Sequence, residues 1–126
     1  MNVVDSSGWL EYFADGTNAA DFAGPIEDRE NLIVPVIALY EVFKRSLQQR
    51  GEEAARLCAA AMQTGQVVNV DAELALGAAK LSYDLKLPMA DSLILATARR
   101  YAATLWTQDE DFAGMSDVRY LAKPKP

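Results

Sequence analysis

Short apolar runs alternate along the chain with longer segments in which apolar residues recur every three or four positions. The runs are only a few residues long and consist mostly of Val, Ile and Leu, which is typical of short buried strands. We predict four such strands and a short fifth one near the end of the sequence. They cover residues 3–4, 32–34, 67–70, 104–106 and 118–121.

The segments between these runs have the periodicity of helices. Gly51 and Gly65 end two of them, and Gly24-Pro25 disturbs another. Asp71 is a suitable N-cap, and Pro88 fits the first turn of the last helix. The predicted helices cover residues 6–14, 19–28, 37–49, 52–64, 72–85 and 88–102, and residues 108–114 form a loop or a single helical turn.

Strands that are short, apolar and separated by helices favour an α/β fold. The sheet is then mostly parallel, has four or five strands and is covered by helices on both faces. The 126 residues fit one domain, which we expect at residues 1–122, followed by a frayed tail at residues 123–126. In such sheets the functional crevice lies beyond the carboxyl ends of the strands.

Acidic residues come from several segments to this edge of the predicted sheet. Asp5 directly follows the first strand, and Asp109 follows the fourth, with Asp111 two residues further on. Asp91 lies in the first turn of the last predicted helix, and Glu41 lies one turn inside the helix after the second strand. We therefore expect carboxylates from four distant segments to meet at one crevice.

Each acid also has a simpler interpretation. Asp5 is a suitable helix N-cap, and Asp91 is favoured by the positive end of a helix dipole. Glu41 can pair with Lys44 or Arg45 one turn further along its helix. For any single residue these alternatives stay open, but four acids from distant segments at one edge favour a shared site.

Carboxylates gathered in this way need a proton or a cation. At ~4 Å and an effective dielectric constant near 20, each pair repels by ~4 kcal/mol. An all-oxygen ligand set favours Mg²⁺ or Mn²⁺ over zinc. Such an ion suits metal-assisted hydrolysis of phosphodiesters, in which a carboxylate orients the attacking water or takes its proton.

The composition narrows the chemistry further. The hydrophobic share of 51% and the charged share of 24% are those of an ordinary globular protein. The absence of His excludes Ser-His-Asp and Cys-His catalysis, and a single Cys excludes an internal disulfide and a Cys cluster. A net charge of −6 would not by itself indicate a nucleic-acid-binding protein.

The motifs that contain the four acids resemble those of a known family. They read Val-Val-Asp5-Ser-Ser, Tyr-Glu41-Val, Ala-Asp91-Ser-Leu-Ile-Leu-Ala-Thr-Ala and Trp-Thr-Gln-Asp109-Glu-Asp-Phe. In order and spacing they resemble the PIN domain, and more narrowly the VapC-type ribonuclease toxins of toxin–antitoxin modules. The resemblance covers nearly the whole chain. It implies a Rossmann-like three-layer α/β/α fold and a metal-dependent endoribonuclease that uses Mg²⁺ or Mn²⁺.

The resemblance also implies individual roles. Asp5, Glu41, Asp91 and Asp109 match the family's acidic quartet, which is catalytic and holds the metal. The auxiliary matches are the hydroxyl position at Ser6 or Ser7, Thr107 before the last acid, and Asp111. Ser92 is a departure, because Ala is common there in the family, and it is expected to add a hydroxyl near the site.

An RNA substrate needs cations against its phosphates. The candidates are Lys44, Arg45, Lys86, Arg99 and Arg100, each of which also fits a solvated helix face.

The resemblance further suggests a homodimer and a tightly bound antitoxin. We expect apolar surface around residues 9–13 and 51–64, and an antitoxin segment between the first helices and the helical pair 37–64. An Arg or Lys of that segment would reach the acids.

The N-terminal residues lack a basic stretch followed by a signal-length apolar run, so we expect a cytoplasmic protein without membrane contact.

Three alternatives remain at this stage. A receiver-like phospho-accepting signalling domain also has an acidic Mg²⁺ pocket, but it needs two acids after the first strand and a Lys after the fifth. Here Asp5 stands without a neighbouring acid, and no Lys follows strand 104–106. A PIN-type RNA-processing nuclease that is not a toxin fits the motifs as well. A non-catalytic interaction protein with the same fold would not need an intact quartet.

Overall fold

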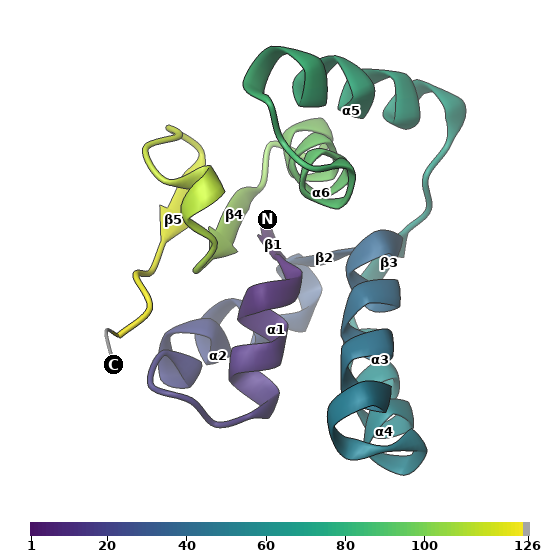
Figure 1. Cartoon of the computed structure of the whole chain (residues 1–126), viewed down its shortest axis with the longest axis vertical. Helices are drawn as coiled ribbons and strands as arrows, with labels where there is room; N and C mark the ends of the chain where they lie inside the picture. Colours follow the sequence, from purple (N-terminus) through teal and green to yellow (C-terminus); the bar gives the residue numbers. More distant parts are fainter. Residues whose placement is uncertain (125–126) are drawn as a thin grey trace.

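A five-stranded, entirely parallel sheet forms the centre of the molecule, in a computed structural model that describes residues 1–124 (Figure 1). The strand order is β3-β2-β1-β4-β5, so β1 lies in the middle with β2 and β4 on either side. The strands are β1 (Asn2–Val4), β2 (Leu32–Pro35), β3 (Gln66–Val68), β4 (Thr104–Thr107) and β5 (Val118–Tyr120).

Six helices cover the sheet in layers. In Figure 1, α5 and α6 lie on one side of the strands, whereas α1 and α2 lie on the other, next to the pair formed by α3 and α4. A short 3-10 helix, η1 (Arg29–Asn31), precedes β2, and another, η2 (Glu110–Phe112), lies between β4 and β5. The α-helices are α1 (Ser6–Phe13), α2 (Ala19–Glu27), α3 (Val36–Arg50), α4 (Glu52–Met62), α5 (Ala72–Leu85) and α6 (Met89–Arg100).

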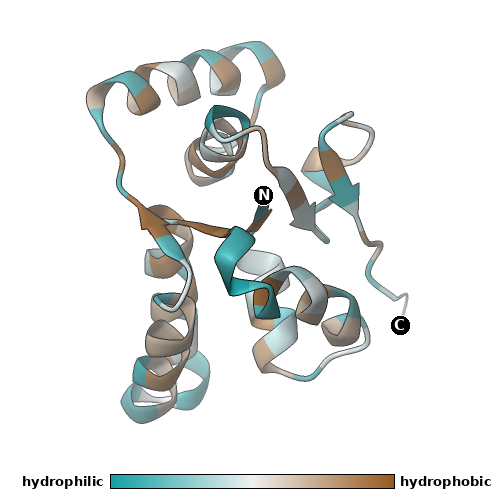
Figure 2. Cartoon of the chain, turned by 180° about the vertical axis from the view of Figure 1, so that it is seen from behind, coloured by the Kyte–Doolittle hydropathy of each residue, from teal (hydrophilic) through white to brown (hydrophobic). Residues whose placement is uncertain are grey.

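The core forms where the helices close over the central strands. Figure 2 shows that hydrophobic residues concentrate along these strands, and all four residues of β2 are buried. Trp9 and Phe22 fill the space beneath the sheet on the α1–α2 side, and Ile94 and Leu95 fill it on the α6 side. Because both faces are covered, β2 and the residues Val3 and Val4 of β1 are continuously apolar and do not alternate with polar residues.

The predicted elements agree with the structure except at their ends. The third strand ends at Val68 instead of residue 70, because Asn69 and Val70 are exposed and lead directly into the cap of α5. The Asp71 side chain accepts a hydrogen bond from the backbone N–H of Leu74, as expected of an N-cap.

Of the tail predicted at 123–126, residues 123 and 124 have no regular structure, and 125–126 lie outside the described residues. Among residues 1–124, no helix has the length and apolar character needed to cross a membrane.

The exposed apolar surface lies partly elsewhere than expected. The expectation of apolar surface around residues 9–13 was wrong for Trp9, which is only 1% exposed and packs in the core. Tyr12 and Phe13 are partly buried around it. The large exposed apolar side chains are on α3 and α4 and also around α5 and the start of α6. They include Tyr40, Leu57, Leu76, Tyr83 and Met89. Exposed apolar residues on α4 were expected, because this helix lies within residues 51–64.

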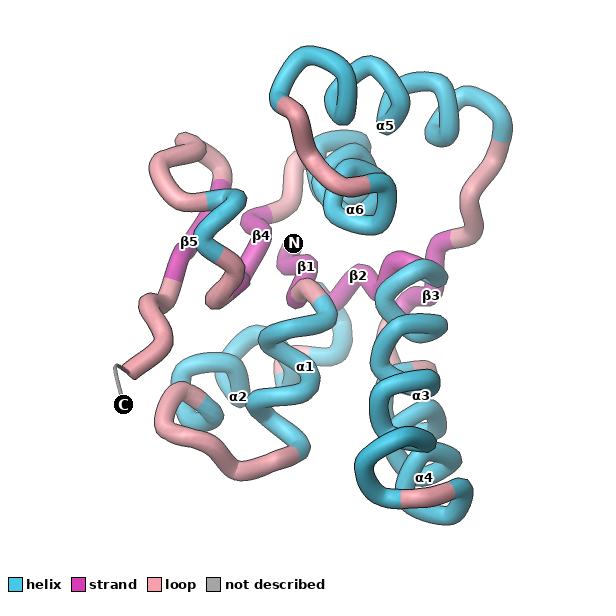
Figure 3. The backbone as a smooth tube through the Cα atoms, in the orientation of Figure 1, coloured by secondary structure: helices cyan, strands magenta, loops and turns pink. Residues whose placement is uncertain are grey.

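The topology brings distant segments to the carboxyl ends of the strands, which we call the carboxyl edge. The turn after β1 and the loop after β4 lie next to each other there, because β1 and β4 are adjacent strands (Figure 3). The backbone N–H of Asp5 donates to the carbonyl of Trp106 at 3.1 Å, which extends this pairing beyond the strand. The first turn of α6 and the N-terminal half of α3 complete this edge.

Gly8 is required where α1 approaches the strand beneath it. A Cβ atom at this position would lie 2.6 Å from Val4 Cγ1 and 2.8 Å from Phe22 Cε1. We therefore expect Gly8→Ala to lower the free energy of unfolding by about 1–3 kcal/mol through overpacking. Gly77→Ala is the matched control in α5, where a Cβ meets nothing within 4 Å. It should raise the free energy of unfolding by about 0.5–1 kcal/mol. Urea unfolding measures both, and a Gly8→Ala variant as stable as the wild type would contradict this packing.

Candidate active site

Asp5 is the most deeply buried acid of the carboxyl edge. Its side chain is held by three donors: the Thr107 hydroxyl at 2.6 Å, the Ser7 hydroxyl at 2.7 Å and the backbone N–H of Gly8 at 2.9 Å. The last of these bonds makes Asp5 the N-cap of α1. The capping interpretation is therefore correct for this residue, and the cap places its carboxylate at the carboxyl edge.

Thr107 connects Asp5, at the end of β1, with Asp109 in the loop after β4. Its hydroxyl donates to Asp5 and accepts a hydrogen bond from the backbone N–H of Asp109 at 2.9 Å. Asp109 in turn caps η2, since its Oδ1 accepts from the backbone N–H of Asp111 at 3.0 Å. This chain of bonds fixes the loop after β4 against the end of β1.

Asp91, Asp109 and Asp111 form an acidic triad. One carboxylate oxygen of each lies within 4.8 Å of the corresponding oxygens of the other two. Asp91 and Asp109 are half-buried and Asp111 is exposed. Asp111, expected only as an auxiliary residue, thus lies in one group with Asp91 and Asp109 of the predicted quartet.

Glu41 is connected to the site through a hydroxyl. The Ser6 hydroxyl donates to Glu41 Oε1 at 2.5 Å, which joins the start of α1 to α3. Within residues 1–124, Glu41 makes no ion pair with Lys44 or Arg45, so the pairing interpretation does not apply. The two neighbouring hydroxyls therefore donate to different acids, Ser6 to Glu41 and Ser7 to Asp5.

Two acids of this edge, Asp5 and Asp91, have raised pKa values. Burial raises the pKa of Asp5 from 3.8 to about 6, although its three hydrogen-bond donors oppose the rise. For Asp91, burial, the charge of Asp109 and a hydrogen bond with Asp109 raise the pKa from 3.8 to about 7, and Asp5 and Asp111 add to the effect. Near neutral pH the cluster is therefore incompletely ionised.

The donor set fits a hard divalent cation. The triad supplies only carboxylate oxygens, which suit Mg²⁺ or Mn²⁺, and the chain has no His and only one Cys for a softer metal. Cys58 is a buried residue of α4 and contributes nothing here. A cation would also compensate the charge repulsion that adds to burial in raising the pKa of Asp91.

Two of the expected RNA-contacting residues are not near the acids. Arg99 and Arg100 lie in the last turn of α6, about 12 Å along the helix axis from Asp91. Arg99 pairs with Asp117 at 3.2 Å, and Arg100 binds both carboxylate oxygens of Asp71 at 3.0 Å. They therefore act in structural ion pairs at the opposite edge of the sheet.

The other three candidate cations lie closer to the site. Lys44 and Arg45 line a small hollow together with Glu41 on α3, and the Lys44 ammonium lies 6.0 Å from the centre of the Tyr40 ring. Lys86 is exposed in the connection between α5 and the first turn of α6.

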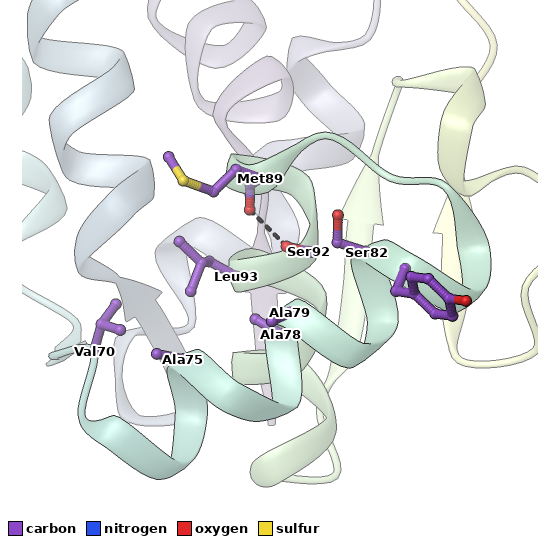
Figure 4. Close-up of a pocket in the computed structure, with 9 residues that line it drawn as sticks. Val70, Ala75, Ala78, Ala79, Ser82, Met89, Ser92 and Leu93 are labelled. Carbon is purple, nitrogen blue, oxygen red and sulfur yellow. Dashed lines mark hydrogen bonds between the residues drawn. The ribbon is translucent and has the colours of Figure 1, made fainter.

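Ser92 does not point to the acids. Its hydroxyl donates to the backbone carbonyl of Met89 at 2.7 Å, and its side chain is buried on the α5 side of α6 (Figure 4). It lines an apolar cavity of about 540 Å³ with Val70, Tyr83 and Met89. The expectation of an additional hydroxyl at the site was therefore wrong, because position 92 faces α5.

Sequence reasoning missed Gln108, which lies between Thr107 and Asp109 and is only 8% exposed. Its backbone N–H donates to the Ser7 hydroxyl at 3.3 Å, and its side-chain oxygen accepts from Asn18 Nδ2 at 3.1 Å. The signal that could have found it is its position inside the most specific acidic motif.

Comparison with known proteins identifies the family. The PIN domain pattern matches residues 3–118, which is nearly the whole chain, and the chain therefore belongs to the PIN-domain family. This membership argues against the receiver-like alternative. Among proteins of curated function, none matches the chain by sequence.

Solved structures share the fold. A chain of a toxin–antitoxin complex from Klebsiella pneumoniae is 23% identical with a TM-score of 0.79, over 94% of this chain and 96% of that one. VapC20 of Mycobacterium tuberculosis, a sarcin–ricin loop cleaving toxin, is 18% identical with a TM-score of 0.74, over 94% and 99%. A DNA-bound VapBC of Salmonella typhimurium is 12% identical with a TM-score of 0.73, over 97% and 98%. This likeness confirms the predicted α/β fold with its parallel sheet.

The raised pKa values predict a specific pH dependence of stability in the presence of a chelator. Between about pH 4 and pH 7 the folded state keeps protons on Asp5 and Asp91 that the unfolded chain has lost. The free energy of unfolding should therefore fall as the pH rises through this range. Asp71 acts in the opposite direction, because Arg100 lowers its pKa to about 2, but its effect is confined to pH values below about 4.

Thermal unfolding in EDTA between pH 4.5 and 8 measures this slope. Asp91→Asn should flatten it, since the amide does not titrate, whereas Asp84→Asn on the exposed face of α5 should leave it unchanged. A melting temperature that rises steadily from pH 5 to pH 7 would contradict the proton-holding cluster.

Proposed function

We propose that this PIN-domain protein is a metal-dependent endoribonuclease that hydrolyses RNA phosphodiester bonds. The observation that carries the proposal is the convergence of Asp91, Asp109 and Asp111 within 4.8 Å, next to the buried Asp5. The fold shared with VapC toxins, one of which is described as cleaving the sarcin–ricin loop, supports an RNA substrate.

The proposed roles follow from the surroundings of each acid. Asp91 and Asp109, with Asp111 and Asp5 beside them, would hold Mg²⁺ or Mn²⁺. When bound, such an ion supplies a water of lowered pKa and positive charge against the phosphate. The Thr107 and Ser7 hydroxyls keep the Asp5 carboxylate oriented, because both donate to it.

Glu41 is the proposed proton acceptor. Its Oε1 accepts from the Ser6 hydroxyl, and its Oε2 has no hydrogen-bond partner within residues 1–124. That oxygen is therefore available to orient the attacking water and take its proton. Lys44 and Arg45 on the same helix would contact phosphates of the RNA strand.

We further propose that the nuclease is the toxin of a VapBC-type pair and acts in the cytoplasm. Structural neighbours described as toxin–antitoxin complexes favour this role over RNA processing. An adjacent reading frame for a small DNA-binding protein would be independent support, and its absence would favour the RNA-processing alternative.

The acids can be tested one at a time with nearly isosteric variants. We expect Asp5→Asn, Asp91→Asn, Asp109→Asn and Glu41→Gln each to reduce Mn²⁺-dependent cleavage of a single-stranded RNA by about 100-fold or more. Their effects should be strongly non-additive in double variants, because the four acids act as a unit. Asp111→Asn should cause a partial loss, since this acid is exposed.

Glu53→Gln in the exposed first turn of α4 is the control and should retain full activity. Asp91→Asn should also melt at least as high as the wild type in chelator at neutral pH, because it removes one repelling charge. Loss of activity without loss of stability separates chemistry from folding. Folded Asp5→Asn and Asp91→Asn proteins that cut RNA at the wild-type rate would overturn the proposed site.

The partners are proposed to use two apolar surfaces. A hollow of about 330 Å³ on α3 and α4, lined by Leu39, Tyr40 and Phe43, lies next to Glu41 and would receive an antitoxin segment. An Arg or Lys of that segment would then approach the acids. The exposed face of α5 and the start of α6, with Tyr83 and Met89, would pack against a second copy.

Light scattering tests the dimer at micromolar concentration. The wild type should have a mass near twice the 13.8 kDa of one chain. Met89→Lys should shift it to the monomer, because it places a charge in the proposed interface, whereas Leu57→Lys on α4 should not. A wild type that is monomeric throughout would remove the dimer from the proposal.

A further inference from the structure

A second cavity shares a wall with the acidic triad. It has a volume of about 620 Å³, and Asp109 and Ser7, which belong to the site already described, form part of its lining. The remaining wall comes from Ala122 and from four larger side chains, those of Gln108, Glu110, Tyr120 and Lys123. The residues of the lining come from the start of α1, the loop after β4, η2, β5 and the segment after β5. None of the four larger side chains has a role in the proposed hydrolysis.

The orientation of the Gln108 amide follows from its partners. Asn18 Nδ2 donates both to Gln108 Oε1 and to the backbone carbonyl of Ala122, each at 3.1 Å. A carbonyl oxygen only accepts, so the Asn18 atom must be the NH₂ group, and the Gln108 atom that faces it must be the oxygen. The Gln108 NH₂ group therefore points elsewhere.

That NH₂ group is free to bind a ligand. It has no acceptor within residues 1–124, and it is not among the buried polar atoms that lack a partner. It therefore keeps contact with open space, and the space that Gln108 lines is this cavity. Gln108, a residue only 8% exposed, thus presents an amide donor to this cavity.

The charged residues that line the cavity favour a neutral ligand over an anionic one. Asp109 and Glu110 supply two carboxylates against the single ammonium of Lys123, so a phosphate group inside the cavity would be repelled. Tyr120, at the carboxyl end of β5, adds a flat aromatic surface. An aromatic ring, an amide donor and a net negative lining together suit a nucleobase, which stacks on aromatic side chains and accepts hydrogen bonds at its edge.

We propose that this cavity binds one unpaired base of the RNA adjacent to the bond that is cleaved. The base stacks against Tyr120, and the Gln108 NH₂ group donates to a carbonyl or ring nitrogen of its edge. Lys123 contacts the phosphate that follows the base outside the cavity. This inference rests on the proposed ribonuclease function, because it assigns the base whose phosphate lies at the acids.

Neutral nucleosides test the cavity without metal and without cleavage. Adenosine, cytidine, guanosine and uridine are each titrated into ¹⁵N-labelled protein in EDTA, with inorganic phosphate as the charged probe. We expect at least one nucleoside to shift the Gln108 side-chain NH₂ signals and the Tyr120 backbone signal in a saturable way. Phosphate should not shift the Gln108 signals. No response to any nucleoside, or an equal response to phosphate, would overturn the proposal.

Matched variants separate stacking from general effects on folding. Tyr120→Leu should weaken nucleoside binding about tenfold, which is the size of one stacking contact, whereas Tyr120→Phe should bind within about twofold of the wild type. Gln108→Glu keeps the acceptor for Asn18 but removes the donor, so it should also weaken binding. Tyr83→Leu on α5 is the control and should have no effect. Unchanged affinity in folded Tyr120→Leu would overturn the stacking contact.

The two proposals fail in different ways. A chain that binds a nucleoside in EDTA but cleaves no RNA with Mn²⁺ overturns the nuclease and leaves a base-binding cavity. A chain that cleaves RNA but binds no nucleoside overturns only the cavity.

Discussion

The burial of the Asp5 carboxylate is the constraint on which the rest of the site depends. This side chain ends the central strand, caps α1 and is 3% exposed, so it loses most of its hydration. Three donors from Ser7, Gly8 and Thr107 replace that hydration and thereby fix the start of α1 and the end of β4 in one place. The same hydroxyl of Thr107 then orients Asp109. A single buried acid thus sets the geometry of the whole carboxyl edge.

The acids around Asp5 are held together against their repulsion. The sheet, the N-terminal turn of α6 and the cap of η2 bring Asp91, Asp109 and Asp111 close, and burial and neighbouring charge raise the pKa of Asp91 to about 7. Such a cluster stores unfavourable electrostatic energy in the folded protein that a divalent cation would relieve. A bound cation would also supply local positive charge for the proposed RNA substrate, which the net charge of −6 would otherwise repel.

Most of the fold could be predicted because its signals are local. Apolar runs marked the strands, Gly51 and Asp71 marked helix ends, and the four acids lay at the strand ends and helix starts that a parallel sheet brings together. The errors came from contacts that sequence spacing does not encode. Arg99 and Arg100 looked free until the fold paired them with Asp117 and Asp71. Ser92, one residue from Asp91, faces α5 because neighbouring helix positions point about 100° apart.

Other features required the tertiary structure. Asp111 belongs with Asp91 and Asp109 because η2 turns the chain immediately after β4. The free donors of Gln108 depend on Asn18, which is ninety residues away in sequence. Trp9, from the segment where apolar surface was expected, is buried in the core together with Phe22 of α2. For Gln108 and Trp9 the deciding partner comes from another element.

Proton release on metal binding is the most direct test of a strained carboxylate cluster that accepts a cation. Calorimetric titration of the protein with Mn²⁺ in two buffers of different ionisation enthalpy measures it. At pH 6.5, Mn²⁺ should displace a substantial fraction of a proton, because Asp91 with a pKa of about 7 is largely protonated there. The release should vanish near pH 9, and Asp91→Asn should bind the ion more weakly with little release at either pH. Binding of Mn²⁺ without proton release at pH 6.5, or no binding at all, would contradict the account.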